Sequence, residues 1–275
     1  MDDVYNRAGS ITRVRQTTLS KNNSSASLAE DRVGLAARGI ADMSKPDWEQ
    51  ARDYLDRSRR EEAESLLHIA AAQGGTEAQF KLGLMYYDGE CVQQDYRQAA
   101  EWFLKAAEQG HAKSQFNLGL MYDNGECTQQ DCSQAAEWFL KAAEQGNVAA
   151  QFTLGVMYSD GEGVPQDYIQ AAAWFRKAAE QGDADAQNNV GAAYHNGKGM
   201  PQNYELAMYW FRKAAEQGDP DAQNNVGVMY DNGNGVPQDY MGALHWYQKA
   251  AEQGQADAKL NLSQLIHRHK KTALN

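Results

Sequence analysis

The sequence is poor in cysteine and proline and has no long apolar run. Its 275 residues include three cysteines and five prolines. An odd, small number of cysteines does not form the disulfide framework of a small secreted protein, and free thiols suit a reducing compartment. No apolar stretch approaches the ~20 residues that a membrane-spanning helix needs. The first residues are acidic and no apolar segment follows them, so no signal peptide is indicated. We therefore expect a cytoplasmic protein without a membrane span.

Positive charge is also scarce. The formal net charge is −11, and residues 78–257 alone carry −13, whereas residues 258–275 carry +4. An acidic body repels the phosphate backbone of DNA and RNA, so we expect no nucleic-acid partner.

Glycine, tyrosine and tryptophan, in contrast, recur with a period of 36 residues. The glycines are Gly83, Gly119, Gly155, Gly191 and Gly227. The tyrosines are Tyr86, Tyr122, Tyr158, Tyr194 and Tyr230, and the tryptophans are Trp102, Trp138, Trp174, Trp210 and Trp246. Self-similarity at a fixed period is the signature of a repeat protein. The five predicted units are 78–113, 114–149, 150–185, 186–221 and 222–257.

Each unit is predicted to begin with one amphipathic helix. In the first unit, Ala78, Leu82 and Met85 are spaced i, i+4 and i+7, which places them on one helical face. Gly89 follows this face and suits the left-handed position that ends a helix.

A second helix is predicted in the remainder of each unit. Asp95 stands at an N-cap position, and Ala99, Trp102 and Phe103 begin an apolar stripe that continues to Gly110. The corresponding N-cap residues of the later units are Asp131, Asp167, Asn203 and Asp239. Because one helical hairpin cannot bury its stripe alone, stacking of neighbouring units must supply the core. The predicted fold is all-α, an α/α superhelical solenoid of helix-turn-helix repeats.

The repeated glycine within the first helix requires a reason, because glycine in a helix costs about 1 kcal/mol relative to alanine. Its recurrence from Gly83 onward predicts that another backbone passes close by. We expect the large Trp and Phe side chains to fill the space toward the neighbouring unit.

Both ends of the chain depart from the repeat. Residues 1–44 are polar around Thr17–Ser27 and are predicted to form a disordered leader, either a plain solvated segment or an export or docking tail. Residues 45–77 are predicted to be a divergent first repeat that caps the array. Residues 258–275 are predicted to form a C-terminal capping helix with a basic end, in which Ser263 replaces the repeated glycine.

The complete repeat pattern is A-x-x-x-L-G-x-M-Y-x-x-G-x-G-V-P-x-D-Y-x-x-A-x-x-W-x-x-K-A-A-E-Q-G, and residues 150–182 match it nearly position for position. Over residues 78–262 the chain resembles the Sel-1-like repeat, a relative of the tetratricopeptide repeat. The resemblance implies an α/α superhelix with adaptor or scaffold roles. A cysteine-rich branch of that family carries a β-lactamase label and has a cysteine pair in each hairpin. Here only Cys127 and Cys132 share a unit, so this branch fits poorly.

No group of residues forms a recognisable catalytic or metal site. A residue present in every unit is more consistent with a structural role, because one active site needs one set of groups. The polar residues that do not recur are His68, His111, Cys132, His195, His245, His267 and His269. His267 and His269 diverge on a helix, and no Ser or Asp pattern completes a triad with His195. We therefore expect no enzyme activity, no metal and no cofactor.

A binding surface is better supported. In the related tetratricopeptide fold the first helices line the concave face, and three repeat positions lie off the core stripe there. These positions hold Phe80, Leu84, Tyr87, Phe116, Leu120, Asp123, Phe152, Val156, Ser159, Asn188, His195, Asn224 and Asp231. The first three units would offer aromatic rings and the last two carboxamides, which can pair with a peptide backbone. Alternatively, the phenylalanine rings pack between neighbouring units.

The predicted function is a non-enzymatic scaffold that binds a protein or an extended peptide segment. The acidic side chains of Asp123 and Asp231 favour a basic ligand. Two alternatives remain open at this point: a hydrolase of the cysteine-rich branch, and a purely structural, self-assembling solenoid.

Overall fold

A computed structural model describes residues 65, 67–89, 92–126 and 129–272. The predicted leader, most of the predicted N-terminal cap, and Cys91 and Cys127 lie outside the described residues. Contacts divide the chain into two compact units, and their described parts are residues 65, 67–89, 92–126 and 129–145 for the first and 146–272 for the second. We refer to them as the α4–α7 unit and the α8–α14 unit.

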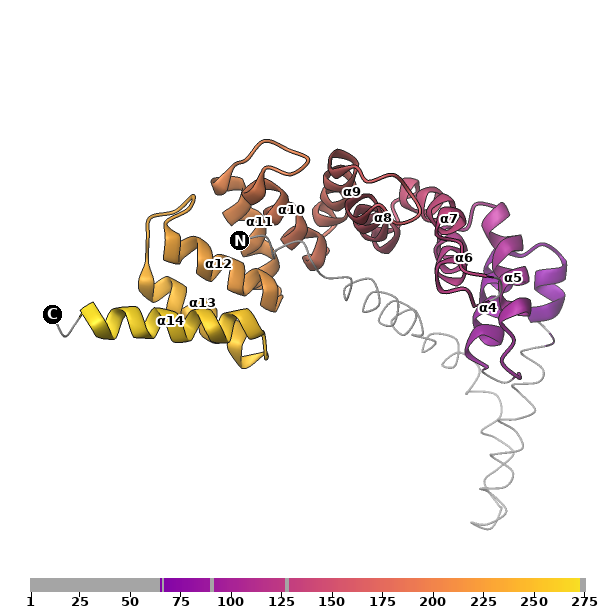
Figure 1. Cartoon of the computed structure of the whole chain (residues 1–275). Coiled ribbons are helices and arrows are strands. Elements are labelled where there is room, and N and C mark those ends of the chain that lie inside the picture. The colour runs from indigo at the N-terminus through magenta and orange to yellow at the C-terminus, as the bar shows by residue number, and fades with distance from the viewer. Residues whose placement is uncertain (1–64, 66, 90–91, 127–128, 273–275) are drawn as a thin grey trace, which may run out of the picture. The chain divides into compact units, whose positions relative to one another are not determined.

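The described residues form helices and connecting turns without a strand, which confirms the predicted fold class (Figure 1). The first helices of the hairpins are α4 (Thr76–Asp88), α6 (Ala112–Asn124), α8 (Val148–Asp160), α10 (Ala184–Asn196) and α12 (Pro220–Asn232). The second helices are α5 (Tyr96–Glu108), α7 (Cys132–Glu144), α9 (Tyr168–Glu180), α11 (Tyr204–Glu216) and α13 (Tyr240–Glu252). Helix α14 (Ala256–Thr272) follows. None of the described helices is both long and apolar enough to cross a membrane.

Side-chain caps and glycines determine where these helices begin and end. The Asp95 carboxylate accepts hydrogen bonds from the backbone N–H groups of Arg97 and Gln98, as predicted for an N-cap. Gly89 ends α4 with φ of 71°, a left-handed conformation that glycine adopts without steric cost. The same two devices recur in the later hairpins, so the local sequence accounts for the repeated helix length.

The repeated glycine faces an aromatic ring and not another backbone, which corrects the prediction. A Cβ atom built on Gly155 would lie 2.5 Å from Cδ1 of Phe175, and one on Gly119 would lie 2.7 Å from Cδ1 of Phe139. Phe139 and Phe175 are fully buried within their own hairpins. Glycine is therefore required because the ring of the second helix lies directly on the first helix.

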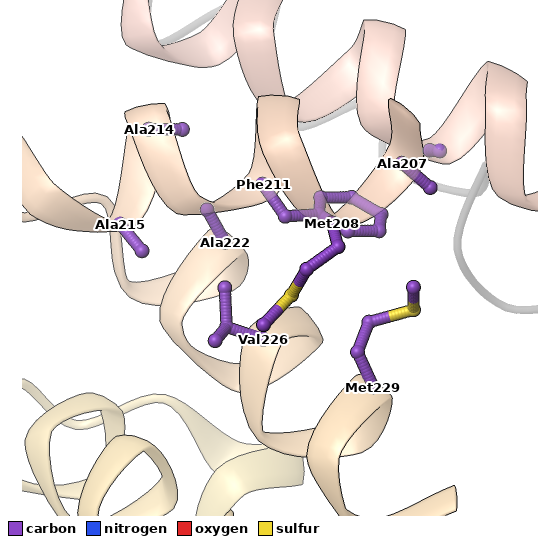
Figure 2. Packing of buried hydrophobic residues seen from close by; sticks show 9 residues of the cluster. Ala207, Met208, Phe211, Ala214, Ala215, Ala222, Val226 and Met229 are labelled. Carbon is purple, nitrogen blue, oxygen red and sulfur yellow. The ribbon is translucent and has the colours of Figure 1, made fainter. Parts of the chain in front are cut away.

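Neighbouring hairpins also share a core, as predicted from the apolar stripes. Met208 and Phe211 of α11 belong to one buried cluster with Val226 and Met229 of α12, the first helix of the next hairpin (Figure 2). This cluster buries apolar surface that a single hairpin would leave in water.

Four of the five repeated tryptophans are half-buried at the margin of the core, whereas Trp174 is buried. Trp138 is half-buried, and the ammonium group of Lys141 lies 3.8 Å from the centroid of its ring. Similar Lys–Trp contacts occur in the other hairpins. Such cation–π contacts contribute about 0.5–1 kcal/mol at exposed sites, less than burial of a whole ring.

Within each of the two units a repeated glutamine joins a hairpin to the one before it, a role that the repeat pattern did not reveal. The Gln115 side chain donates to the carbonyl of Ala107 at the end of α5, and its own oxygen accepts from Gln145 at 2.7 Å. Gln187 makes the corresponding bonds to Ala179 and Gln217. Because these amides are buried, each bond satisfies groups that would otherwise be costly to remove from water.

Phe139→Ala is expected to lower the free energy of unfolding by about 3–5 kcal/mol, because it removes a completely buried ring. Trp138→Ala should have a smaller effect, because that ring is already partly in water. Chemical denaturation of both variants measures the difference. Equal losses would contradict the placement of Phe139, and not Trp138, at the centre of the hairpin.

Gly155→Ala is expected to destabilise the protein by about 1–3 kcal/mol, because the new methyl group would overlap the ring of Phe175. The gain in helix propensity, about 1 kcal/mol, is too small to offset this overlap. Thermal unfolding of Gly155→Ala, Phe175→Leu and the double variant tests the contact. The two losses should be less than additive in the double variant, because leucine leaves room for the methyl group, and strict additivity would refute the contact.

Candidate functional site

The aromatic part of the predicted binding surface is buried, which corrects the expectation of exposed rings. Phe80, Phe116 and Phe152 are 5%, 1% and 2% exposed. The ring centroid of Phe116 lies 5.5 Å from that of Phe139, its partner within the same hairpin. Phe80 and Phe152 contact Phe103 and Phe175 in the same way. This face of the first helix turns toward the second helix, so the rings belong to the core.

The neighbouring apolar and hydroxyl positions offer little more surface. Leu120, Val156 and Ser159 are buried, whereas Leu84 and Tyr87 are half-buried. The Tyr87 hydroxyl donates to the Glu126 carboxylate at 2.9 Å. Burial is the largest cause that raises the pKa of Tyr87, and the negative charge of Glu126 is the next. Tyr87 therefore serves to join α4 to the loop after α6.

The two acidic residues of the predicted surface are not exposed to a ligand. Asp123 and Asp231 are both buried. The Asp231 carboxylate pairs with the guanidinium group of Arg268 on α14. Burial is the largest cause that raises the pKa of Tyr247, and the negative charge of the nearby Asp231 carboxylate is the next. The expectation of a basic ligand thus loses its main support.

The asparagines of the later hairpins form hydrogen-bonded pairs between first helices. The Asn225 amide on α12 donates to the carbonyl oxygen of Asn188 on α10 at 2.9 Å. The Asn261 amide on α14 donates to Asn224 on α12, also at 2.9 Å. We name these four residues the amide row. The structure thus brings Asn188 and Asn224 into one array, and it adds Asn225 and Asn261.

Each pair uses only one polar end of each side chain. The amide nitrogens of Asn188 and Asn224 and the carbonyl oxygens of Asn225 and Asn261 make no hydrogen bond within the described part of the chain. Each pair therefore retains donors and an acceptor without a partner in this part of the chain. Asn188, Asn225 and Asn261 are partly exposed, whereas Asn224 is buried. All four residues lie within the α8–α14 unit.

The side chains around the amide row are small or polar. Ala192 and Val228 occupy the helical turn beyond Asn188 and Asn224. Asn196 and Asn232 are exposed one turn further along the same helices. His195 is half-buried beside the ring of Tyr204, at 5.2 Å between centroids. Small neighbours leave the carboxamides as the main polar groups of this face.

The identity of one residue in each preceding hairpin determines whether a pair forms. The preceding hairpin has Asn188 at the position that faces Asn225. At the corresponding position, the hairpin that precedes Asn117 has Phe80. Asn117 is 1% exposed, and neither polar atom of its amide has a hydrogen-bond partner among the described residues. Asn189 follows a hairpin with phenylalanine and bonds the carbonyl of Asp185 in its own helix instead. The amide row therefore begins only at α10.

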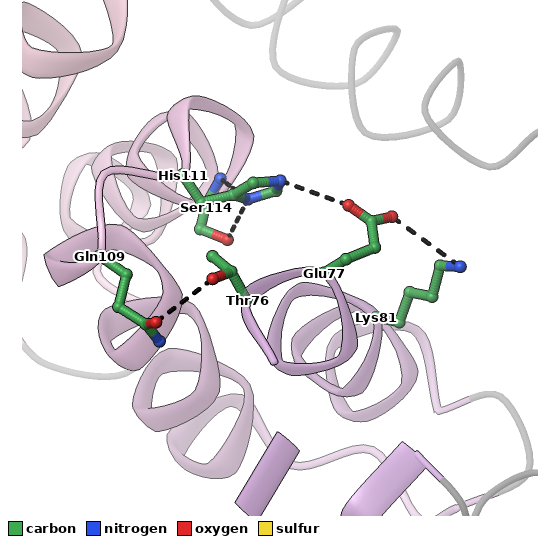
Figure 3. Close-up of polar contacts among 6 residues, drawn as sticks. All are labelled: Thr76, Glu77, Lys81, Gln109, His111 and Ser114. Carbon is green, nitrogen blue, oxygen red and sulfur yellow. Dashed lines mark hydrogen bonds and ion pairs between the residues drawn. The ribbon is translucent and has the colours of Figure 1, made fainter. Parts of the chain in front are cut away.

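A second polar cluster lies in the α4–α7 unit and was not recognised from the sequence. The Nε2 atom of His111 lies 3.5 Å from a carboxylate oxygen of Glu77, and its Nδ1 atom lies 2.8 Å from the Ser114 hydroxyl (Figure 3). This order of acid, imidazole and hydroxyl is that of a hydrolytic triad. However, Ser114 is completely buried, so no substrate can reach its hydroxyl group.

The position of His111 explains the cluster without catalysis. His111 is the N-cap of α6, and its Nδ1 atom accepts from the backbone N–H of Ser114 at 3.2 Å. The same position holds Asn147 before α8, Asp183 before α10 and Asp219 before α12, and each of them accepts the corresponding bond. The arrangement is therefore a helix cap.

Comparison with known proteins agrees with this architecture. The family model described as Sel1 repeat matches residues 76–111, 112–147, 148–183, 184–219 and 220–255, each beginning two residues before the unit counted from the sequence. No match emerged among curated proteins.

Two solved structures are similar over most of the chain. A protective antigen present in uropathogenic Escherichia coli strains, which displays an SLR fold, is 40% identical with a TM-score of 0.71. The match covers 75% of this chain and 44% of that one, so the chain spans less than half the length of that relative. A Sel1 repeat protein from Oxalobacter formigenes is 36% identical with a TM-score of 0.68, and the match covers 72% and 82%. The matched repeats and both relatives show that this chain belongs to the Sel1 repeat family.

Proposed function

We propose that the protein is a non-enzymatic scaffold that binds an extended peptide segment of another protein through the amide row. Sel1 repeat proteins act generally as scaffolds for protein interactions. The observation that carries the finer proposal is the pairing of Asn188 with Asn225 and of Asn224 with Asn261. Pairing orders the four side chains in advance, so that a ligand does not have to immobilise them.

The free ends of the amide row suit a peptide backbone. A peptide group presents one N–H donor and one C=O acceptor, and each pair of asparagines presents amide N–H groups beside a carbonyl oxygen. Neighbouring helices are spaced by about 8–10 Å, which corresponds to about three residues of an extended chain. A segment that crosses α10, α12 and α14 could therefore engage both pairs.

The charges of this face favour a ligand without strong basic character. Asp231 is already paired with Arg268, and the amide row itself is neutral. Binding through neutral hydrogen bonds responds weakly to ionic strength, in contrast to binding between exposed charges. We therefore expect the affinity to change little between low and moderate salt.

The double variant Asn188→Asp with Asn224→Asp is expected to weaken binding of peptides selected from a random 12-residue library by about tenfold. Aspartate keeps the oxygen that accepts from Asn225 or Asn261 but lacks the amide N–H donors. Fluorescence anisotropy of a labelled selected peptide gives the affinity. Thermal unfolding of Asn188→Asp alone should change little, because the bond between the helices is retained, whereas a carboxylate at the buried position of Asn224 should lower the melting temperature.

A matched control separates loss of the donor from added negative charge. Gln170→Glu with Gln248→Glu adds the same charge to exposed positions on α9 and α13 of the same unit. This control should bind like the unchanged protein. Equal binding by both double variants would refute the amide row as the site. Growth of light scattering with concentration, without selection of any peptide, would instead support a self-assembling solenoid.

A further inference from the structure

We propose that His111 is an acid-sensitive clamp between the first two complete hairpins of the α4–α7 unit. While its imidazole is neutral, it caps α6 and contacts α4, and protonation removes the cap. The proposal rests on the hydrogen bonds of His111, on its place at a helix N-terminus, and on the residues that occupy the same place elsewhere in the chain.

The cap requires the neutral imidazole with its proton on Nε2. In this tautomer the unprotonated Nδ1 atom accepts from the backbone N–H of Ser114, while Nε2–H points toward Glu77 (Figure 3). A second proton would occupy Nδ1. The Ser114 N–H group would then have no acceptor, although Nδ1–H could donate to the Ser114 hydroxyl.

The charged groups around His111 act in opposite directions. Glu77 on α4 favours the imidazolium ion, but its side chain is 66% exposed and Lys81 lies 3.8 Å from it. Lys113 on α6 disfavours the cation, and so does the positive N-terminal end of α6. The Phe80 ring, 4.8 Å away between centroids, helps to shield the imidazole from water. Burial is the largest of these effects and lowers the pKa of His111.

The direction of the pH effect follows from this lowered pKa. The unfolded chain takes up the proton first, near the ordinary histidine value of about 6.5. The clamp is therefore fully present above about pH 6.5, and its contribution to stability is lost as the pH falls through and below that value. Its effect falls on the first turn of α6, which the imidazole packs against Phe80 of α4, because the bond that is lost is the one to the Ser114 N–H group.

The other hairpins provide a control within the same chain. Asn147 makes the same N-cap bond to the N–H of Ala150 at 2.9 Å, and an amide does not titrate in this range. Asp183 and Asp219 also cap at this position, and as carboxylates they remain acceptors at mildly acidic pH. Only the cap of α6 among these hairpins depends on a neutral imidazole, so acid should weaken the start of this helix selectively.

The test compares the full chain with His111→Asn between pH 7.5 and 5.0. Asparagine reproduces the cap of α8, so the variant should lose less thermal stability than the unchanged protein as the pH falls. The protection of the Ser114 amide against hydrogen exchange, relative to its intrinsic rate, should fall about fivefold in the unchanged protein, or ~1 kcal/mol. His195→Asn is the matched histidine control, and it should keep the pH dependence of the unchanged protein.

Nuclear magnetic resonance of the unchanged protein gives a readout that does not require a variant to fold. The imidazole nitrogens of His111 should show the Nε2–H tautomer at pH 7.5 and a pKa below that of an exposed histidine. The same pH dependence of stability in His111→Asn, or a proton on Nδ1 at pH 7.5, would overturn the proposal. So would undiminished protection of the Ser114 amide after His111 has titrated.

Discussion

The contact between an aromatic ring and a helical glycine holds each hairpin together. In the third hairpin the Phe175 ring lies so close to Gly155 that no Cβ atom fits between them. The contact repeats in the other hairpins, with Tyr247 on Gly227 in the last of them. It brings the two helices close enough for alanines to fill the remaining space, and it turns the neighbouring phenylalanine of the first helix, such as Phe152, into the same core. The predicted aromatic binding surface is absent for this reason.

Stacking of the hairpins adds a second constraint, which is polar. Buried glutamines such as Gln115 and Gln187 bond both the preceding helix end and the last turn of their own hairpin. These bonds have strict geometry and leave few polar groups unsatisfied, so they determine the register between neighbours in addition to the apolar contacts. Residues that take part in neither the ring-on-glycine contact nor the glutamine bonds can differ between hairpins. These residues give individual hairpins their own properties.

The amide row and His111 are both variations of this kind. Asparagine replaces phenylalanine at one position of α10 and α12, and an array of paired carboxamides results. Histidine replaces asparagine or aspartate at one N-cap, and the cap becomes sensitive to acid. Neither change disturbs the hairpin, because the ring-on-glycine contact and the buried glutamines are retained. Single substitutions can thus change the polar groups of individual hairpins while the fold is kept.

The period of 36 residues, the helix caps and the apolar stripes are local properties, and the sequence by itself determined the all-α hairpin repeat from them. It also predicted that Asn188 and Asn224 occupy the same repeat position, although the phenylalanines at that position, such as Phe152, lie in the hairpin core. The burial of Phe116, the pairing of Asp231 with Arg268 and the contact of His111 with Glu77 were decided only in the tertiary structure. Each depends on residues one hairpin or more away along the chain. Helical periodicity shows which residues share a face, but only the packing of a neighbouring helix decides whether that face meets water, an ion or a ring.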